Sequence, residues 1–180
     1  MDIDKAIYGR HSTRYFSSKP VSDEDLMAIL DAGCQAPSSK NDLPWKVMIV
    51  RPDRLKRISD EMLVGVDPGS RTDLVEGTFR AMGTAPVCIF IFFCPPDDSR
   101  YLAHMQSLGA FMQNMMLKAY SKGLGTLWCG DILFCPEAAM KALGTDQPPV
   151  AALLVGYESD RAEKKIHKAP EDIIIGGLDV

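Results

Sequence analysis

Apolar residues recur at helical spacing in five stretches of the chain, which predicts five helices. Ser22 followed by Asp25 resembles a capping box, and Gly123 and Gly144 are suited to end two of the helices. The fourth helix is apolar over much of its circumference, so we expect it to be substantially buried. The five helices are expected near residues 3–9, 22–36, 52–63, 100–122 and 136–143.

Three other stretches have the residue pattern of strands: 45–50, 87–93 and 150–157. Residues 87–93 are a continuous β-branched and aromatic run, which is typical of a central strand covered on both faces. A lone apolar triplet, Ile173–Ile175, should form a short strand that pairs with another element. Residues 65–78 contain three glycines and a proline, and we expect them to form a mobile loop.

The length indicates one compact domain over residues 1–180. We expect an α+β fold, in which helices cover a central, largely antiparallel sheet. Hydrophobic residues make up 46% of the chain, enough for a substantial core. The net charge of −4 argues against a nucleic-acid partner. Five cysteines without a C-x-x-C pair and no apparent signal peptide suggest a cytoplasmic protein without a metal site. The longest apolar run is too short to span a membrane.

Two polar patches near the N-terminus carry the candidate chemistry. Residues 10–14 bring together two guanidinium groups, an imidazole and two hydroxyls, and arginine suits phosphate acceptors. Residues 37–45 combine hydroxyl and amide side chains with a large aromatic ring. Taken alone, the first patch could be a solvated basic turn and the second a connecting loop. Together they predict a pocket for a flat, phosphorylated ligand, and flavin mononucleotide (FMN) fits that description.

The ordered set of motifs resembles the FMN-dependent nitroreductase family in its small single-domain form. The matching segments run in family order over nearly the whole chain. They are Arg10–Arg14, Ala36–Trp45, Gln113–Ala119, Gly123–Gly130, Val155–Tyr157 and the basic segment Lys164–Lys168.

This resemblance implies an interlocked homodimer, with the C-terminal segment crossing to the partner and FMN between the subunits. It also implies an oxidoreductase that passes hydride from NADH or NADPH through the flavin to nitroaromatics, quinones or similar electron-poor acceptors. Two alternatives stay open. One is a specialised reaction on the same scaffold, such as reductive dehalogenation or flavin destruction, which a lid at 65–78 would favour. The other is a non-catalytic flavin-binding protein.

The same resemblance assigns the cofactor contacts residue by residue. Arg10, His11 and Ser12 would meet the phosphate and ribityl side, and Arg14 would tune the flavin from its pyrimidine edge. The partner's loop would add four contacts and the segment before Gly130 would lie along the flavin, while a late basic residue would reach the phosphate. These further contacts are Pro37, Ser38, Ser39, Asn41, Leu127, Trp128, Cys129, Gly130 and one of Lys165, His167 and Lys168.

Some residues have a simpler interpretation or depart from the family pattern. Leu43 stands where the family often has glutamine, so one polar contact to the flavin edge is missing. Trp128 could equally be a core residue. Cys129 has no neighbouring acid–base partner in the sequence, which argues against covalent catalysis. His104 is expected to be a surface or packing residue.

Overall fold

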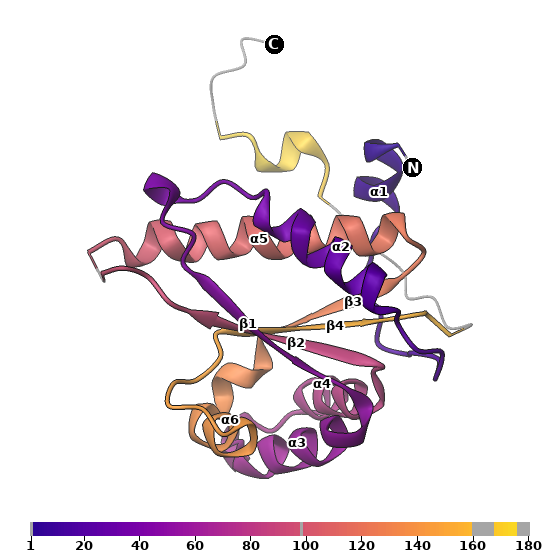
Figure 1. Ribbon diagram of the computed structural model, residues 1–180, viewed down its shortest axis with the longest axis vertical. Coiled ribbons are helices and arrows are strands. Elements are labelled where there is room, and N and C mark those ends of the chain that lie inside the picture. Colours follow the sequence, from indigo (N-terminus) through magenta and orange to yellow (C-terminus); the bar gives the residue numbers. More distant parts are fainter. Residues whose placement is uncertain (1, 98, 160–167, 176–180) are drawn as a thin grey trace.

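The computed structural model describes residues 2–97, 99–159 and 168–175. Within these ranges, helices cover both faces of one antiparallel sheet (Figure 1), which confirms the predicted α+β class. The α-helices are α1 (Ile3–Gly9), α2 (Asp23–Cys34), α3 (Pro52–Gly65), α4 (Asp73–Thr84), α5 (Tyr101–Ser121) and α6 (Pro136–Leu143). The strands are β1 (Trp45–Val50), β2 (Val87–Phe93), β3 (Gly125–Cys129) and β4 (Ala151–Gly156). Short 3₁₀ helices are η1 (Ser39–Asn41), η2 (Pro68–Ser70), η3 (Asp131–Phe134) and η4 (Pro170–Ile173).

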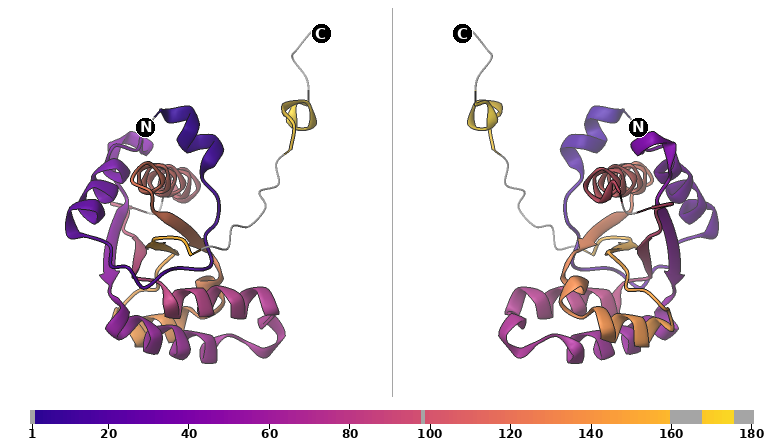
Figure 2. Two further views of the ribbon diagram at one scale, coloured as in Figure 1. Left: turned by 90° about the vertical axis from the view of Figure 1, so that its right-hand side faces the viewer. Right: turned by 90° about the vertical axis from the view of Figure 1, so that its left-hand side faces the viewer.

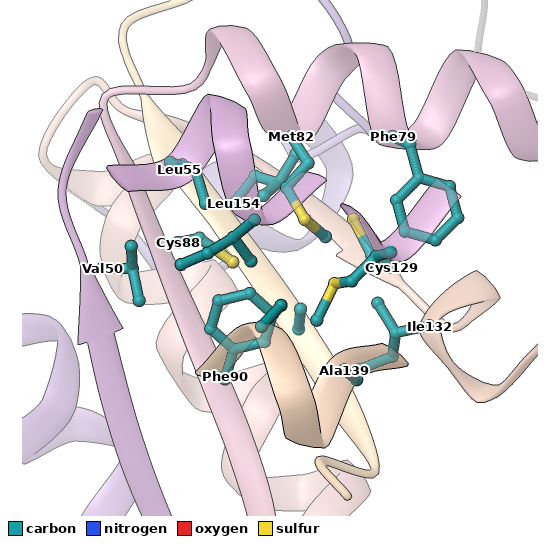
Figure 3. Packing of buried hydrophobic residues seen from close by; sticks show 14 of the residues in the cluster. Val50, Leu55, Phe79, Met82, Cys88, Phe90, Cys129, Ile132, Ala139 and Leu154 are labelled. Atoms are coloured by element: carbon teal, nitrogen blue, oxygen red, sulfur yellow. The ribbon is translucent and has the colours of Figure 1, made fainter. Parts of the chain in front are cut away.

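The strand order is β1-β2-β4-β3, so β2 lies inside the sheet, as its apolar run predicts. Successive side chains of β2 point to opposite faces. Cys88 and Phe90 join a cluster formed with α3, α4 and α6 (Figure 3), whereas Ile89 and Ile91 join a second cluster with α2 and α5. Figure 2 shows the resulting three layers from the side. Because both faces of β2 are buried, it needs apolar residues at every position.

The predicted helix ends are confirmed. The Ser22 hydroxyl accepts a hydrogen bond from the Asp25 amide at 3.0 Å and so caps α2. Gly144 ends α6 with φ of 72°, and Gly123 follows α5 with φ of 76°. Both angles lie in the left-handed region that glycine adopts without steric cost.

The prediction of a mobile loop over residues 65–78 is wrong. The segment contains the end of α3, then η2 and the first half of α4. The Thr72 hydroxyl accepts from the Val75 amide and caps α4, and Val75, Phe79 and Met82 bury one face of this helix. The three glycines suggested a loop, although Val75, Phe79 and Met82 follow the spacing of a helix. The segment packs with α3 on the lower face of the sheet in Figure 1. It therefore does not form the lid that would favour a specialised reaction.

Two shorter segments also add to or differ from the predicted elements. Residues 125–129, which are not among the three predicted strands, form the edge strand β3 and pair with β4 along their whole length. The triplet 173–175 is not a strand, since Ile173 ends η4 and the other two residues have no regular structure. All three isoleucines are exposed, and η4 stands apart from the layered body (Figure 2). Among the described residues, no strand pairs with this triplet.

Candidate functional site

The basic patch at residues 10–14 lies against the edge strand β3. The Thr13 amide donates to the Thr126 carbonyl at 2.8 Å, and Ser12 forms a parallel bridge with Thr126. The approach is very close, because a Cβ added to Gly125 would lie 2.3 Å from the Thr13 hydroxyl oxygen. Glycine at 125 therefore lets the basic segment dock on the sheet.

A cavity of about 180 Å³ opens between this segment, the end of α5 and the start of β3. Arg10, Thr13 and Glu158 are among the residues that line it. Arg10 Nε and Thr13 Oγ1 are buried and have no hydrogen-bond partner among the described residues. Leaving buried polar atoms unpaired is costly, and because these two belong to residues that line a cavity, they are candidates for binding a group that enters it. An arginine and a hydroxyl in the lining of one cavity fit an anionic, oxygen-rich group such as a phosphate.

His11 faces the same cavity but is engaged within the protein. Its Nε2 lies 2.8 Å from a carboxylate oxygen of Glu158, and its Nδ1 lies 3.1 Å from the Gly9 carbonyl oxygen. The hydrogen bond with Glu158 raises the pKa of His11, and the Gly9 carbonyl adds to this effect. No motif in the sequence points to Glu158, which is 147 positions away from His11.

The His11–Glu158 pair should make stability depend on pH. The pKa of His11 is raised on folding, so its contribution is complete below the unfolded pKa of about 6.5 and disappears as pH rises through the folded pKa. Glu158→Gln should therefore lower the free energy of unfolding by about 0.5–1 kcal/mol at pH 6 and by less at pH 9, measured by urea denaturation. Glu61→Gln, which breaks a pair with Arg57, is the control, because it removes an exposed ion pair that contains no histidine. Equal losses at both pH values for Glu158→Gln would contradict the assignment.

The side chains of β3 divide between the core and the outside. Leu127 and Cys129 are buried in the cluster below the sheet, so either could meet a ligand through its backbone only. Trp128 points the other way and is 43% exposed, which rules out the core interpretation. Gly130, two residues after Trp128, is also exposed. An exposed aromatic ring therefore lies on the edge strand against which the basic patch packs.

The buried cysteines are poor nucleophiles. Burial raises the pKa of the Cys129 thiol far above its usual range, and the nearby Asp131 carboxylate adds to this, while the Arg14 guanidinium opposes it. Burial also raises the pKa of Cys135 to about 11. The thiolate is the reactive form, so the geometry supports the expectation that Cys129 does no covalent chemistry.

The loop with the other predicted contacts lies far from residues 10–14 within one chain. The Ser39 amide donates to the Ser107 hydroxyl at 3.1 Å, so this loop packs on the first half of α5. Gly9 instead lies against Tyr120, near the end of α5. At 1.5 Å per residue, Ser107 and Tyr120 are about 20 Å apart along the helix. One chain does not bring the two patches together, so a shared site requires a second copy.

The loop residues themselves are accessible or partly so. Pro37 and Asn41 are exposed, and Ser38 and Ser39 are half-buried. Of the late basic residues, Lys168 is exposed, whereas Lys165 and His167 lie outside the described residues. Among the residues that the structure describes, no group of three or more metal-ligating side chains gathers, and no helix is long and apolar enough to cross a membrane.

The fold and site define an α+β protein with a basic, partly unpaired cavity at one edge of an antiparallel sheet. Comparison with known proteins narrows this class. The family model described as "Nitroreductase family" matches residues 7–157. The chain belongs to the nitroreductase family, as its motifs predict, and is accordingly an oxidoreductase.

Individual relatives cover most of the chain. It is 35% identical over 162 residues to the NADH dehydrogenase of Thermus thermophilus, covering 86% of this chain and 79% of the relative. It is 26% identical over 188 residues to the FMN reductase (NAD(P)H) of Bacillus subtilis, covering 91% of this chain and 69% of the relative. The solved structure of the FMN-dependent nitroreductase NfnB from Mycobacterium smegmatis in complex with NADPH has the same fold, with a TM-score of 0.81, 18% identity and 97% of each chain covered.

Proposed function

We propose that the protein is an FMN-dependent oxidoreductase that takes electrons from NADH or NADPH and reduces nitroaromatics, quinones or similar electron-poor acceptors. The observation that carries the proposal is the cavity with the buried, unpaired Arg10 Nε and Thr13 Oγ1, which fits a phosphate. Family membership and the FMN- and NAD(P)H-related names of relatives support the same cofactors. When bound, FMN supplies the hydride chemistry.

The residues of the chain would hold and tune this cofactor. Arg10 would pair with the phosphate, and Ser12 would lie on the ribityl side, while Lys168, Lys165 or His167 would add a second positive charge to the phosphate. Arg14 lies near enough to β3 to act on the Cys129 thiol, so its charge is also available to a ring on that edge. A cation at the pyrimidine edge would stabilise negative charge there. The exposed ring of Trp128 would exclude water from one side of the site.

Glu158 sets a condition on phosphate binding. Its carboxylate borders the same cavity as Arg10 and would repel an anion. The hydrogen bond from His11 compensates this charge when the imidazole is protonated. We therefore assign His11 the role of shielding Glu158 beside the phosphate, rather than that of a direct phosphate ligand alone.

The proposed site is completed in a homodimer. The loop with Pro37, Ser38, Ser39 and Asn41 would approach the flavin from the partner, since it lies about 20 Å along α5 from the chain's own basic patch. Exposed apolar side chains on α1 and in the C-terminal segment support association, because such residues are usually covered. They are Ile3, Ile7, Tyr8, Ile173, Ile174 and Ile175.

Deleting residues 173–180 should weaken the dimer. The segment would cross to the partner, where its isoleucines, of which Ile175 is fully exposed, would be buried. Reburying even one isoleucine contributes about 1.5 kcal/mol, so the dimer dissociation constant should rise about tenfold or more. Light scattering over a dilution series measures this constant. A dimer equally stable without the segment would show that the tail does not cross.

Stopped-flow spectroscopy tests the function itself. Protein reconstituted with FMN should lose its flavin absorbance on mixing with NADH or NADPH and regain it on addition of menadione or a nitroarene. Absence of bleaching with both nucleotides would refute the reductase and favour a non-catalytic flavin protein. Failure to retain FMN at all would refute the cofactor assignment.

A further inference from the structure

The loop over residues 38–43 has an unusual backbone. Lys40, Asn41 and Leu43 have φ of 50°, 61° and 48°, the left-handed region that is unfavourable for residues with a side chain. Three such residues in one short loop would not persist unless their surroundings held them. Strained segments of this kind concentrate at binding sites. We therefore expect contacts from neighbouring elements to stabilise this loop conformation.

Polar residues at the start of α5 make these stabilising contacts with the loop. Arg100 precedes the helix, and His104 and Ser107 follow at four and three positions, so all three lie on one face. His104 Nε2 donates to a carboxylate oxygen of Asp42 at 3.0 Å, and Arg100 Nη1 lies 3.6 Å from the same oxygen. Ser107 accepts the hydrogen bond from the Ser39 amide and donates to the Ala103 carbonyl at 2.8 Å. The loop is thus bound to the helix at both ends of η1.

The segment is also fixed on either side of these contacts. The Leu43 amide donates to the Ser38 hydroxyl at 3.1 Å, which closes the loop on itself. Just after it, the ring of Trp45 stacks on Phe111 with centroids 4.7 Å apart. Phe111 lies one turn beyond Ser107 on α5. One stripe of this helix therefore holds the whole segment from Ser39 to Trp45.

Burying the imidazole of His104 costs more free energy than burying an apolar side chain at the same position would. Its side chain is fully buried, and its Nδ1 has no hydrogen-bond partner among the described residues. The neighbouring buried positions of α5, Leu108 and Met112, are apolar. An apolar residue at 104 would pack without an unpaired polar atom. Its contact with Asp42 is the one thing that an apolar residue could not supply.

We propose that His104 is a positioning residue, which holds Asp42 so that the 38–43 loop presents Ser38, Ser39 and Asn41 to the flavin in their binding conformation. The inference rests on the proposed function, since those three residues are its predicted partner-side contacts. His104 does not touch the cofactor within its own chain. It acts by keeping the loop in a conformation that the loop would not keep by itself.

Two substitutions of His104 separate positioning from packing. His104→Gln keeps an N–H donor near the Nε2 position, whereas His104→Leu keeps the volume and removes the donor. FMN affinity, measured by fluorescence titration of the protein, should fall about tenfold or more in His104→Leu and stay within about threefold of wild type in His104→Gln. Gln106→Ala, on the opposite face of the same helix, should leave affinity unchanged.

Hydrogen exchange at residues 38–43 gives a readout that is independent of the cofactor. Exchange there should be faster in His104→Leu than in wild type, while the strands exchange as before. If His104→Leu does not fold, Ser107→Ala replaces it and should show a smaller change of the same kind. Wild-type FMN affinity or unchanged loop exchange in a folded His104→Leu protein would overturn the inference. A wild-type protein that binds no FMN would refute the proposed function instead, and exchange alone would then decide whether His104 holds the loop.

Discussion

Arg10→Ala should weaken FMN binding by about 10- to 150-fold. Arg10 Nε is buried in the cavity without a partner, and a hydrogen bond between a charged donor and a phosphate contributes about 1.5–3 kcal/mol. The free energy of unfolding of the cofactor-free protein should change little, because the Arg10 side chain makes no hydrogen bond or ion pair within the described part of the chain. Titration of the cofactor-free protein with FMN measures the effect.

Two further variants make this result specific. Arg57→Ala removes an exposed arginine paired with Glu61 on α3, and should leave FMN affinity unchanged. Arg10→Lys keeps the charge but loses the planar fork, so its affinity should lie between those of wild type and Arg10→Ala. Equal affinity of Arg10→Ala and wild type would remove Arg10 from the site.

Gly125→Ala should both destabilise the protein and weaken FMN binding. The added methyl group would lie 2.3 Å from the Thr13 hydroxyl oxygen and 2.8 Å from its Cβ, so the 10–14 segment must move off the edge of β3. Overpacking of this kind costs about 1–3 kcal/mol. Because Arg10 moves with the segment, FMN affinity should fall at least about tenfold. Thermal unfolding and FMN titration give the two quantities.

Gly77→Ala is the matched control for this variant. A Cβ at Gly77 meets no atom within 4 Å, and the residue lies inside α4, where alanine favours the helix by about 0.5–1 kcal/mol. This variant should be slightly more stable than wild type and bind FMN equally well. If Gly125→Ala behaves in the same way as Gly77→Ala, the 10–14 segment is not held against β3 as the structure has it.

Most of the secondary structure follows from local patterns. The continuous apolar run of β2 and the helical spacing in α5 predict both elements. Burial requires apolar residues at regular positions, and that pattern can be recognised along the sequence. The capping of α2 by Ser22 and the end of α6 at Gly144 are likewise local, since each depends on residues within one turn. The helix α4 and the strand β3 were missed because glycines lie within the first and at the start of the second. Their stability comes from packing on α3 and pairing with β4.

The sequence by itself determined most of the elements, the family and the types of residue that a flavin phosphate site would need. Only the tertiary structure decided which of these groups are neighbours. It paired His11 with Glu158 across 147 positions and His104 with Asp42 across 62, and it separated the two polar patches along α5. The physical reason is that local patterns report burial and backbone preference, whereas hydrogen bonds between distant segments depend on how helices and strands pack.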